Sequence, residues 1–121
     1  MHDSIKNYIH ITSAIKLKLE DQKNNKIPKI IAVSKTFKLE RILPLLDFGH
    51  LDYGENKVQE AIDKWTDIKM TKPSIRLHLI GKLQTNKVKF ALKIFDYIHS
   101  VDSKKLAKKI ADEEIKQKKK V

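Results

Sequence analysis

The stretch KIIAVSKT, residues 29–36, decides the fold class of this chain of 121 residues. Ile30 to Val33 form an uninterrupted apolar run in which all residues but one are β-branched. Runs of this kind are typical of strands that are buried on both faces, as in parallel sheets. The run is followed by the charged amine of Lys35. We therefore expect a lysine to stand at the end of a buried strand.

Three further strands are predicted along the chain, each followed by apolar residues at helical spacing. Their segments are LDYGEN (51–56), SIRLHLIG (74–81) and DYIHSVD (96–102). Successive strands start about 22 residues apart, and this alternation with helices predicts a parallel α/β sheet with right-handed crossovers. An open doubly wound sheet and a (β/α)8 barrel share the pattern. Because a complete barrel needs roughly 200 residues or more, four units would be half of a TIM-type barrel.

A leading helix is predicted over residues 1–22, where apolar side chains recur every three or four positions. These side chains are Ile5, Tyr8, Ile11, Ile15 and Leu19. The polar segment DQKNNKIP (21–28) is expected to be a linker, because Pro28 disfavours helix before it. Pro44 predicts a kink in the next helix, or a helix start after Phe37. The prediction is one partial domain over 1–121, with the leading helix over 1–22 and four βα units over 29–121.

Composition narrows the classes of partner. The formal charge is +11 at pH 7, but Arg41 and Arg76 are the only arginines, and eight lysines lie in the last 18 residues. Because base readout relies on arginine forks, a solvated lysine-rich face is favoured over a nucleic-acid partner. With no cysteine, disulfides, thiolate chemistry and Cys-based zinc sites are excluded. No apolar run approaches the roughly 20 residues that span a bilayer, and no signal-peptide pattern opens the sequence. We expect a cytoplasmic protein with no membrane partner.

Polar residues at the carboxyl ends of the predicted strands are the candidates for chemistry, because ligands bind there in both architectures. Lys35 is the most informative, since an amine that loses hydration becomes a nucleophile toward carbonyl groups. The alternative is a lysine that simply reaches solvent from the strand end. His78 alternates with Leu77 and Leu79, so it either faces a barrel lumen or hydrogen-bonds in the core. No dinucleotide, Walker A or nucleophile-elbow motif is present, and no histidine–acid pattern indicates a metal site.

Four spaced motifs carry a resemblance to a known family. They are AVSKT (32–36), FGH…YGENKVQEA (48–61), HLIGKLQTNK (78–87) and IHSVDS (98–103). In this order and spacing, they resemble the pyridoxal-phosphate homeostasis proteins, the YggS/PROSC family, which is similar to the N-terminal domain of alanine racemase. The resemblance covers essentially all of residues 28–110.

The resemblance implies the N-terminal half of a (β/α)8 barrel that holds pyridoxal 5′-phosphate at its strand ends. It assigns Lys35 to the Schiff-base lysine and Asn56 to a position beside the cofactor ring. It places His78, Gly81 and Ser100 on strand ends that line the same pocket. It implies a role in intracellular pyridoxal-phosphate homeostasis without a defined catalytic turnover, with apo-enzymes as acceptors of the cofactor.

The chain departs from the family by stopping near the end of the fourth unit. The family's later half supplies a Ser/Gly-rich phosphate-binding segment and an arginine facing the pyridine nitrogen, and Arg41 and Arg76 are not obvious substitutes. We expect a partial sequence that binds the cofactor weakly or needs a partner half. Two other hypotheses stay open: a pyridoxal-phosphate enzyme of amino-acid racemase type, which would need a second acid/base residue opposite the lysine, and a basic nucleic-acid-binding module.

Overall fold

The computed structural model describes residues 2–23 and 26–121. The strands are β1 (Ala32–Val33), β2 (Asp52–Glu55), β3 (Arg76–Leu79) and β4 (Tyr97–Ile98). The helices are α1 (Asp3–Asp21), α2 (Leu39–Phe48), α3 (Val58–Thr71), α4 (Val88–Ile94) and α5 (Lys104–Gln117), and a 3-10 turn over Thr85–Lys87 precedes α4. The predicted alternation of four strands with four helices after a leading helix is therefore observed.

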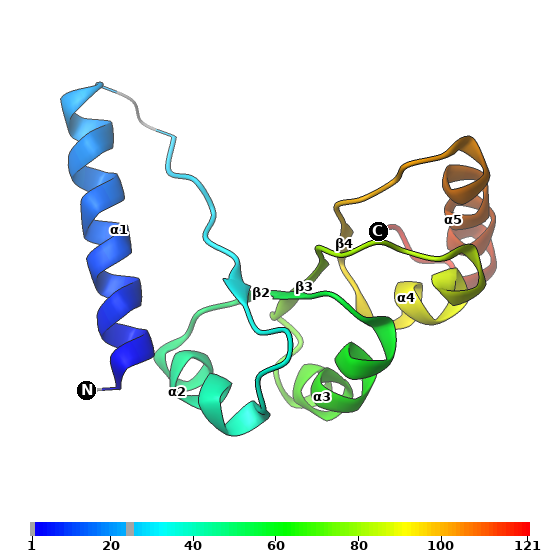
Figure 1. Cartoon of the computed structure of the whole chain (residues 1–121), viewed down its shortest axis with the longest axis horizontal. Coiled ribbons are helices and arrows are strands. Elements are labelled where there is room, and N and C mark those ends of the chain that lie inside the picture. The colour runs from blue at the N-terminus through cyan, green and yellow to red at the C-terminus, as the bar shows by residue number, and fades with distance from the viewer. Residues whose placement is uncertain (1, 24–25) are drawn as a thin grey trace.

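The four strands form one parallel sheet in the order β1-β2-β3-β4 (Figure 1). Each strand pairs with its neighbour in sequence, through Ala32 with Tyr53, Tyr53 with Leu77 and His78 with Tyr97. A doubly wound sheet reverses its strand order at a switch point, whereas a barrel keeps sequential neighbours side by side. The sequential order matches half of a (β/α)8 barrel.

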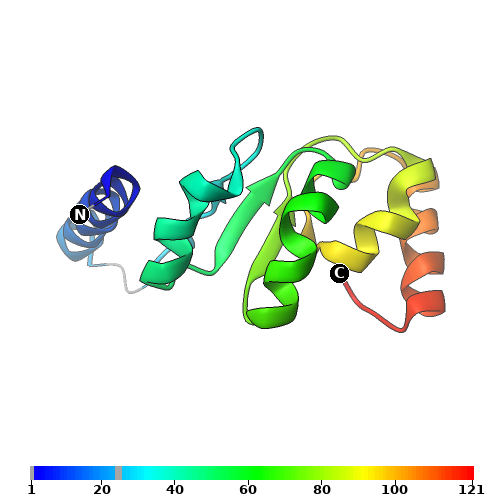
Figure 2. The same ribbon diagram turned by 90° about the horizontal axis from the view of Figure 1, so that it is seen from below.

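The hydrophobic core lies between the sheet and helices α2 to α5. Figure 2 shows α2, α3 and α4 in front of the strands. The largest fully buried side chains include Trp65 of α3, Tyr53 of β2 and Phe95 after α4. Alternation along the strands explains the pattern, since every second residue points to the helices. This outer face is packed by the chain itself.

Helix α1 is the leading helix predicted over residues 1–22; Met1 lies outside the described residues, as do Asn24 and Asn25 of the predicted linker. It stands apart from the sheet at the β1 end (Figure 1) and has no buried residue among those described. It contacts the body through Tyr8, whose ring packs edge-on against Phe48 and His50.

The expectation that the first strand is buried on both faces is wrong for this chain. Strand β1 has two residues, and Val33 is 50% exposed. The outer face of the strand packs toward the helices, but its other face opens on the concave side of the sheet (Figure 1). Burial on both faces requires chain packed against the concave face as well, and no described segment lies there.

The second helix begins at Leu39, after Phe37, and Pro44 lies inside it. The later start agrees with one of the two outcomes that Pro44 predicts. The helix ends at Gly49, whose φ of 106° is left-handed and whose N–H donates to the carbonyls of Leu45 and Leu46. This is a common helix termination for glycine, which bears no Cβ penalty there.

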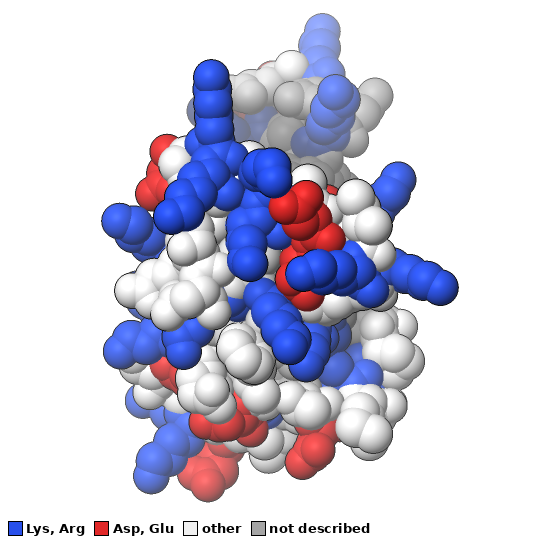
Figure 3. Space-filling model, turned by 90° about the vertical axis from the view of Figure 1, so that its right-hand side faces the viewer, with Lys and Arg blue, Asp and Glu red and all other residues white. Residues whose placement is uncertain are grey.

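Lysine side chains project over the face that carries α4 and α5 (Figure 3). Carboxylates lie among them in the same view, and Lys108 pairs with Asp112 on α5 at 3.4 Å. The positive charge is thus spread over solvated helix surfaces, interrupted by acidic side chains.

Candidate functional site

The candidate site is built on a turn that follows β1. Residues 34–37 form it, with the Phe37 N–H donating to the Ser34 carbonyl at 3.2 Å. Thr36 has φ of 63°, the left-handed region that non-glycine residues occupy at a cost. Lys35 is half-buried, and its ammonium has no hydrogen-bond or ion-pair partner within the described part of the chain. Ser34, the residue before it, points to Glu55 on the helix side, so continued alternation would put the Lys35 side chain on the concave side of the sheet.

Glu55, the last residue of β2, faces the opposite way and is completely buried. Its carboxylate accepts hydrogen bonds from the Ser34 hydroxyl and from the Trp65 indole N–H, the latter at 3.0 Å. Lys64 of α3 completes the set, with its Nζ 3.1 Å from Glu55 Oε2. These donors satisfy a buried charge that would otherwise be expensive.

Lys64 also links this carboxylate to the turn. Its Nζ donates to the Ser34 carbonyl at 2.7 Å and to Glu60 Oε1 at 3.2 Å. Glu60 in turn accepts the Thr36 N–H at 2.6 Å. Partial burial raises the pKa of Glu60, but the hydrogen bonds from Thr36 and Lys64 outweigh it and hold the pKa below its ordinary value.

Asn56 and Gly81 meet at the carboxyl ends of β2 and β3. A Cβ on Gly81 would lie 2.7 Å from the Asn56 carbonyl oxygen and 2.9 Å from its side-chain oxygen. Glycine at position 81 therefore permits the close approach of the two strand ends. The Ile80 N–H, next to Gly81, donates to the Glu55 carbonyl at 3.0 Å.

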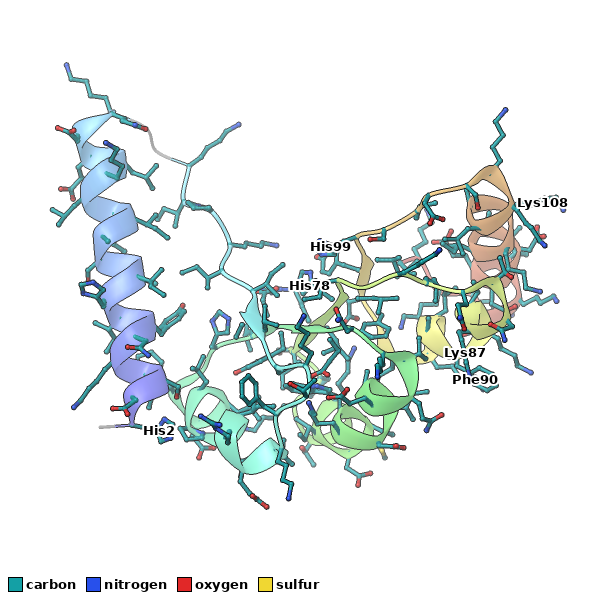
Figure 4. All side chains as sticks on the ribbon, viewed as in Figure 1. His2, His78, Lys87, Phe90, His99 and Lys108 are labelled. Atoms are coloured by element: carbon teal, nitrogen blue, oxygen red, sulfur yellow. The ribbon has the colours of Figure 1, made fainter. Side chains whose placement is uncertain are left out.

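His78 belongs to a second polar cluster on the concave side of the sheet. Figure 4 shows His78 and His99 together, on the side opposite α2 and α3. His78 Nδ1 lies 2.9 Å from His99 Nε2, and His78 Nε2 lies 2.9 Å from Asp52 Oδ1. Because a carboxylate only accepts, His78 Nε2 donates in that bond. The His78 ring stacks on Tyr97 at 4.5 Å.

Arg76 closes this cluster with a bidentate contact to Asp52, at 2.8 Å from Nε and 2.7 Å from Nη2. The Arg76 guanidinium lowers the pKa of Asp52 to about 2, with a further contribution from His78 and against the effect of burial. The same contact raises the pKa of Arg76. Asp52 is thus held ionised on the concave face.

The structure brings together only part of the predicted set. Asn56 and Gly81 touch, whereas His78 belongs to the histidine cluster beside them and Ser100 follows β4. No hydrogen bond in the described residues joins the side chain of Lys35 or Ser100 to the other three. All five residues come from the four strands or the segments that directly follow them, as expected from the sequence.

The sequence assigns no role to Glu55, Lys64 or Asp52, although Glu55 is one of the polar residues at the end of the second predicted strand. Glu55 carried a usable signal, because it alternates with the core residue Tyr53 and so had to face the helices as a buried carboxylate. Asp52 required the register of β2 against β3, which places it opposite Arg76. That register cannot be derived from a single sequence.

Residues 2–23 and 26–121 contain neither a metal-binding cluster nor a membrane-spanning helix. No group of three or more metal-ligating side chains there could hold a metal ion. No helix among the described segments is long and apolar enough to cross a membrane.

Known proteins resemble this chain in sequence. A pyridoxal phosphate homeostasis protein of Vibrio alginolyticus is 36% identical over 112 residues, which are 88% of this chain and 47% of the relative. The protein of the same name from Buchnera aphidicola is 42% identical over 89 residues, or 71% of this chain and 38% of the relative. By sequence, the chain matches part of the length of proteins in the pyridoxal phosphate homeostasis family. No family model matches it.

Solved structures agree with this relationship to the pyridoxal phosphate homeostasis family. PipY of Synechococcus elongatus, solved with pyridoxal phosphate bound, is 37% identical with a TM-score of 0.69, over 86% of this chain and 50% of PipY. An unknown protein from Bifidobacterium adolescentis is 27% identical with a TM-score of 0.79, over 98% of this chain and 54% of that one. The chain spans about half the length of the relatives it matches. The predicted fold class, half of a barrel, is confirmed.

Proposed function

We propose that this chain binds pyridoxal 5′-phosphate at the carboxyl ends of its strands and takes part in intracellular pyridoxal-phosphate homeostasis, with apo-enzymes as acceptors of the cofactor. The binding and homeostasis parts of the proposal extend to this chain what the names of its relatives state, and the apo-enzyme acceptors are inferred from the family resemblance alone. The observation that carries it is the amine of Lys35, which lies unpartnered among the described residues on the turn after β1.

The residues present fit the aldehyde end of the cofactor. Lys35 would hold it as a Schiff base, in which the amine nitrogen bonds to the aldehyde carbon and water leaves. Asn56, His78, Gly81 and Ser100 would line the pocket, and the contact of Asn56 with Gly81 shapes the strand ends next to the ring. No Ser/Gly-rich segment follows any of the four strands, so we expect this chain to bind the phosphate group weakly.

Borohydride trapping tests the assignment of Lys35. The chain is incubated with pyridoxal phosphate, reduced, digested and mapped by mass spectrometry, so that each modified lysine is identified. We expect Lys35 to be modified at the lowest cofactor concentration, and the visible absorbance of the lysine-bound cofactor to vanish in Lys35→Ala. Lys38→Ala, which removes an exposed neighbouring lysine, is the matched control.

Modification spread evenly over the surface lysines, or unchanged absorbance in Lys35→Ala, would overturn the proposal. The racemase hypothesis makes a different demand, namely racemisation of alanine above a control without protein. Salt-sensitive binding of duplex DNA without a cofactor signal would instead favour the nucleic-acid hypothesis.

A further inference from the structure

The two residues that flank Lys35 are both held by hydrogen bonds to β2 or α3. Ser34 is held through its N–H, which donates to the Gly54 carbonyl at 2.9 Å, and through its carbonyl, which accepts from Lys64. Thr36 is held through its N–H by Glu60. The Lys35 side chain itself makes none of these contacts.

The conformation of Thr36 makes such anchoring necessary. A left-handed φ at a β-branched residue is strained, and such strain persists only where surrounding contacts over-determine it. Besides the bond of the Thr36 hydroxyl to the Lys35 carbonyl, the surrounding contacts are Glu60 on the Thr36 N–H and Lys64, which pairs with Glu60 and holds the carbonyl two residues earlier. Without them the turn would relax toward an unstrained conformation, and the direction of the Lys35 side chain would change with it.

Glu55 joins this turn to the other strand ends of the candidate site. Its side chain bonds Ser34 after β1, its carbonyl accepts the Ile80 N–H after β3, and its neighbour Asn56 packs on Gly81. One fully buried residue therefore connects three strand ends. Its carboxylate lies toward the helices, so it acts on the site through other residues and does not enter it.

We propose that Glu55 and Lys64, together with Glu60, position Lys35: the buried ion pair holds the strand-end turn from the helix side and directs the Lys35 amine into the concave face. The inference rests on the proposed role of Lys35 and assigns no catalytic part to the pair. The ion pair does not contact the cofactor. The inference predicts that breaking the pair reduces the preference of pyridoxal phosphate for Lys35 over the other lysines.

Lys69 provides a matched control on the same helix. It pairs with one carboxylate, Asp96 at 2.6 Å, where Lys64 pairs with two, and like Lys64 it donates to one carbonyl, that of Ile94 at 3.0 Å. The side chains of Lys64 and Lys69 are 9% and 18% exposed. Asp96 also accepts the Leu77 N–H, so Lys69 stabilises the end of the sheet at which β3 and β4 begin, opposite the turn at 34–37. Loss of packing alone would affect Lys64→Met and Lys69→Met alike.

The test compares Lys64→Met, Glu55→Gln and Lys69→Met with the parent chain by two readouts. Amide hydrogen exchange without cofactor reports on the turn, and borohydride trapping with pyridoxal phosphate reports on Lys35. We expect Lys64→Met to speed exchange at Thr36 and Phe37 and to reduce trapping at Lys35 about tenfold or more. Glu55→Gln keeps the shape and loses the charge, so it should do the same to a lesser degree. Lys69→Met should leave both readouts at 34–37 unchanged.

The outcomes separate this inference from the proposed function. If the parent chain traps no cofactor at Lys35 but Lys64→Met still loosens the turn, the proposed function fails and the anchoring stands. If the parent traps cofactor at Lys35 and Lys64→Met changes neither readout, the positioning role is overturned. Equal effects of Lys64→Met and Lys69→Met at the turn would also overturn it, since they would indicate general loosening.

Discussion

Strand β2 carries a carboxylate at each end, and the two lie on opposite faces of the sheet. Glu55 points to the helices, is fully buried and bonds Ser34, Lys64 and Trp65. Asp52 points to the concave face and pairs with Arg76, which is 36% exposed. The chain itself closes the outer network, whereas the concave network is open to solvent at its margin. The four βα units therefore enclose the Glu55 network by themselves, whereas they leave the Asp52–Arg76 pair partly exposed to solvent.

The largest effect is expected from breaking the outer pair. Glu55→Ala leaves the Trp65 N–H without its acceptor, and it removes the buried one of the two carboxylates that pair with Lys64. The Ser34 hydroxyl then has only the Gly54 carbonyl, at 3.2 Å. Removal of one partner from a buried pair costs about 3–5 kcal/mol of unfolding free energy. Urea unfolding of the parent and the variant measures the loss. Glu60→Ala is the control, because Glu60 bonds the same Lys64 but its side chain is 28% exposed. Equal losses in the two variants would contradict the importance of burial.

The Asp52–Arg76 pair on the concave face should make the unfolding free energy depend on pH in the acid range. The pKa of Asp52 is about 2 in the folded chain against an ordinary value of 3.8. The stability from its contact with Arg76 is therefore present above about pH 4 and is lost as the pH falls through about 2, by up to about 2 kcal/mol. Unfolding free energies of the parent and Asp52→Asn should differ at about pH 5 and converge near pH 2. Parallel curves would show that Asp52 contributes no pH dependence.

The fold was largely predictable from the sequence, because the strand–helix alternation and the polar strand ends are local patterns. The apolar run at 30–33 does not by itself predict burial on both faces, since apolar composition does not show whether another strand lies across the lumen. The networks escaped prediction for a different reason. Contacts of Asp52 with His78 depend on register, and those of Lys64 with Ser34 join residues distant in the chain. Neither is encoded in a local spacing.

A smaller effect is expected at the carboxyl ends of β2 and β3, where Gly81 contacts Asn56. In Gly81→Ala, the new Cβ would press on the backbone oxygen of Asn56, which cannot rotate away, so we expect a loss of about 1–2 kcal/mol. Gly54→Ala is the comparison, because its Cβ would meet only the side chains of Ile31 and Ile80, both at 3.1 Å. Thermal unfolding of the two variants measures both. A larger cost at Gly54 would mean that the concave face is the tighter of the two sites.

The smallest effect is expected from an ion pair between a lysine and a carboxylate that has the spacing of Lys64–Glu60 but is exposed to solvent. Lys108 and Asp112 are also four residues apart on a helix, but their side chains are 80% and 52% exposed. Exposed pairs of this kind contribute about 0.3–0.5 kcal/mol, and salt screens them further. Lys108→Ala also removes one positive charge from a chain of net charge +11, which relieves repulsion and offsets part of the loss. Unfolding of Lys108→Ala at low and high salt should therefore stay within about 0.5 kcal/mol of the parent. A loss as large as that of Glu60→Ala would show that helical spacing, and not contact with the turn, gives the Lys64 pair its strength.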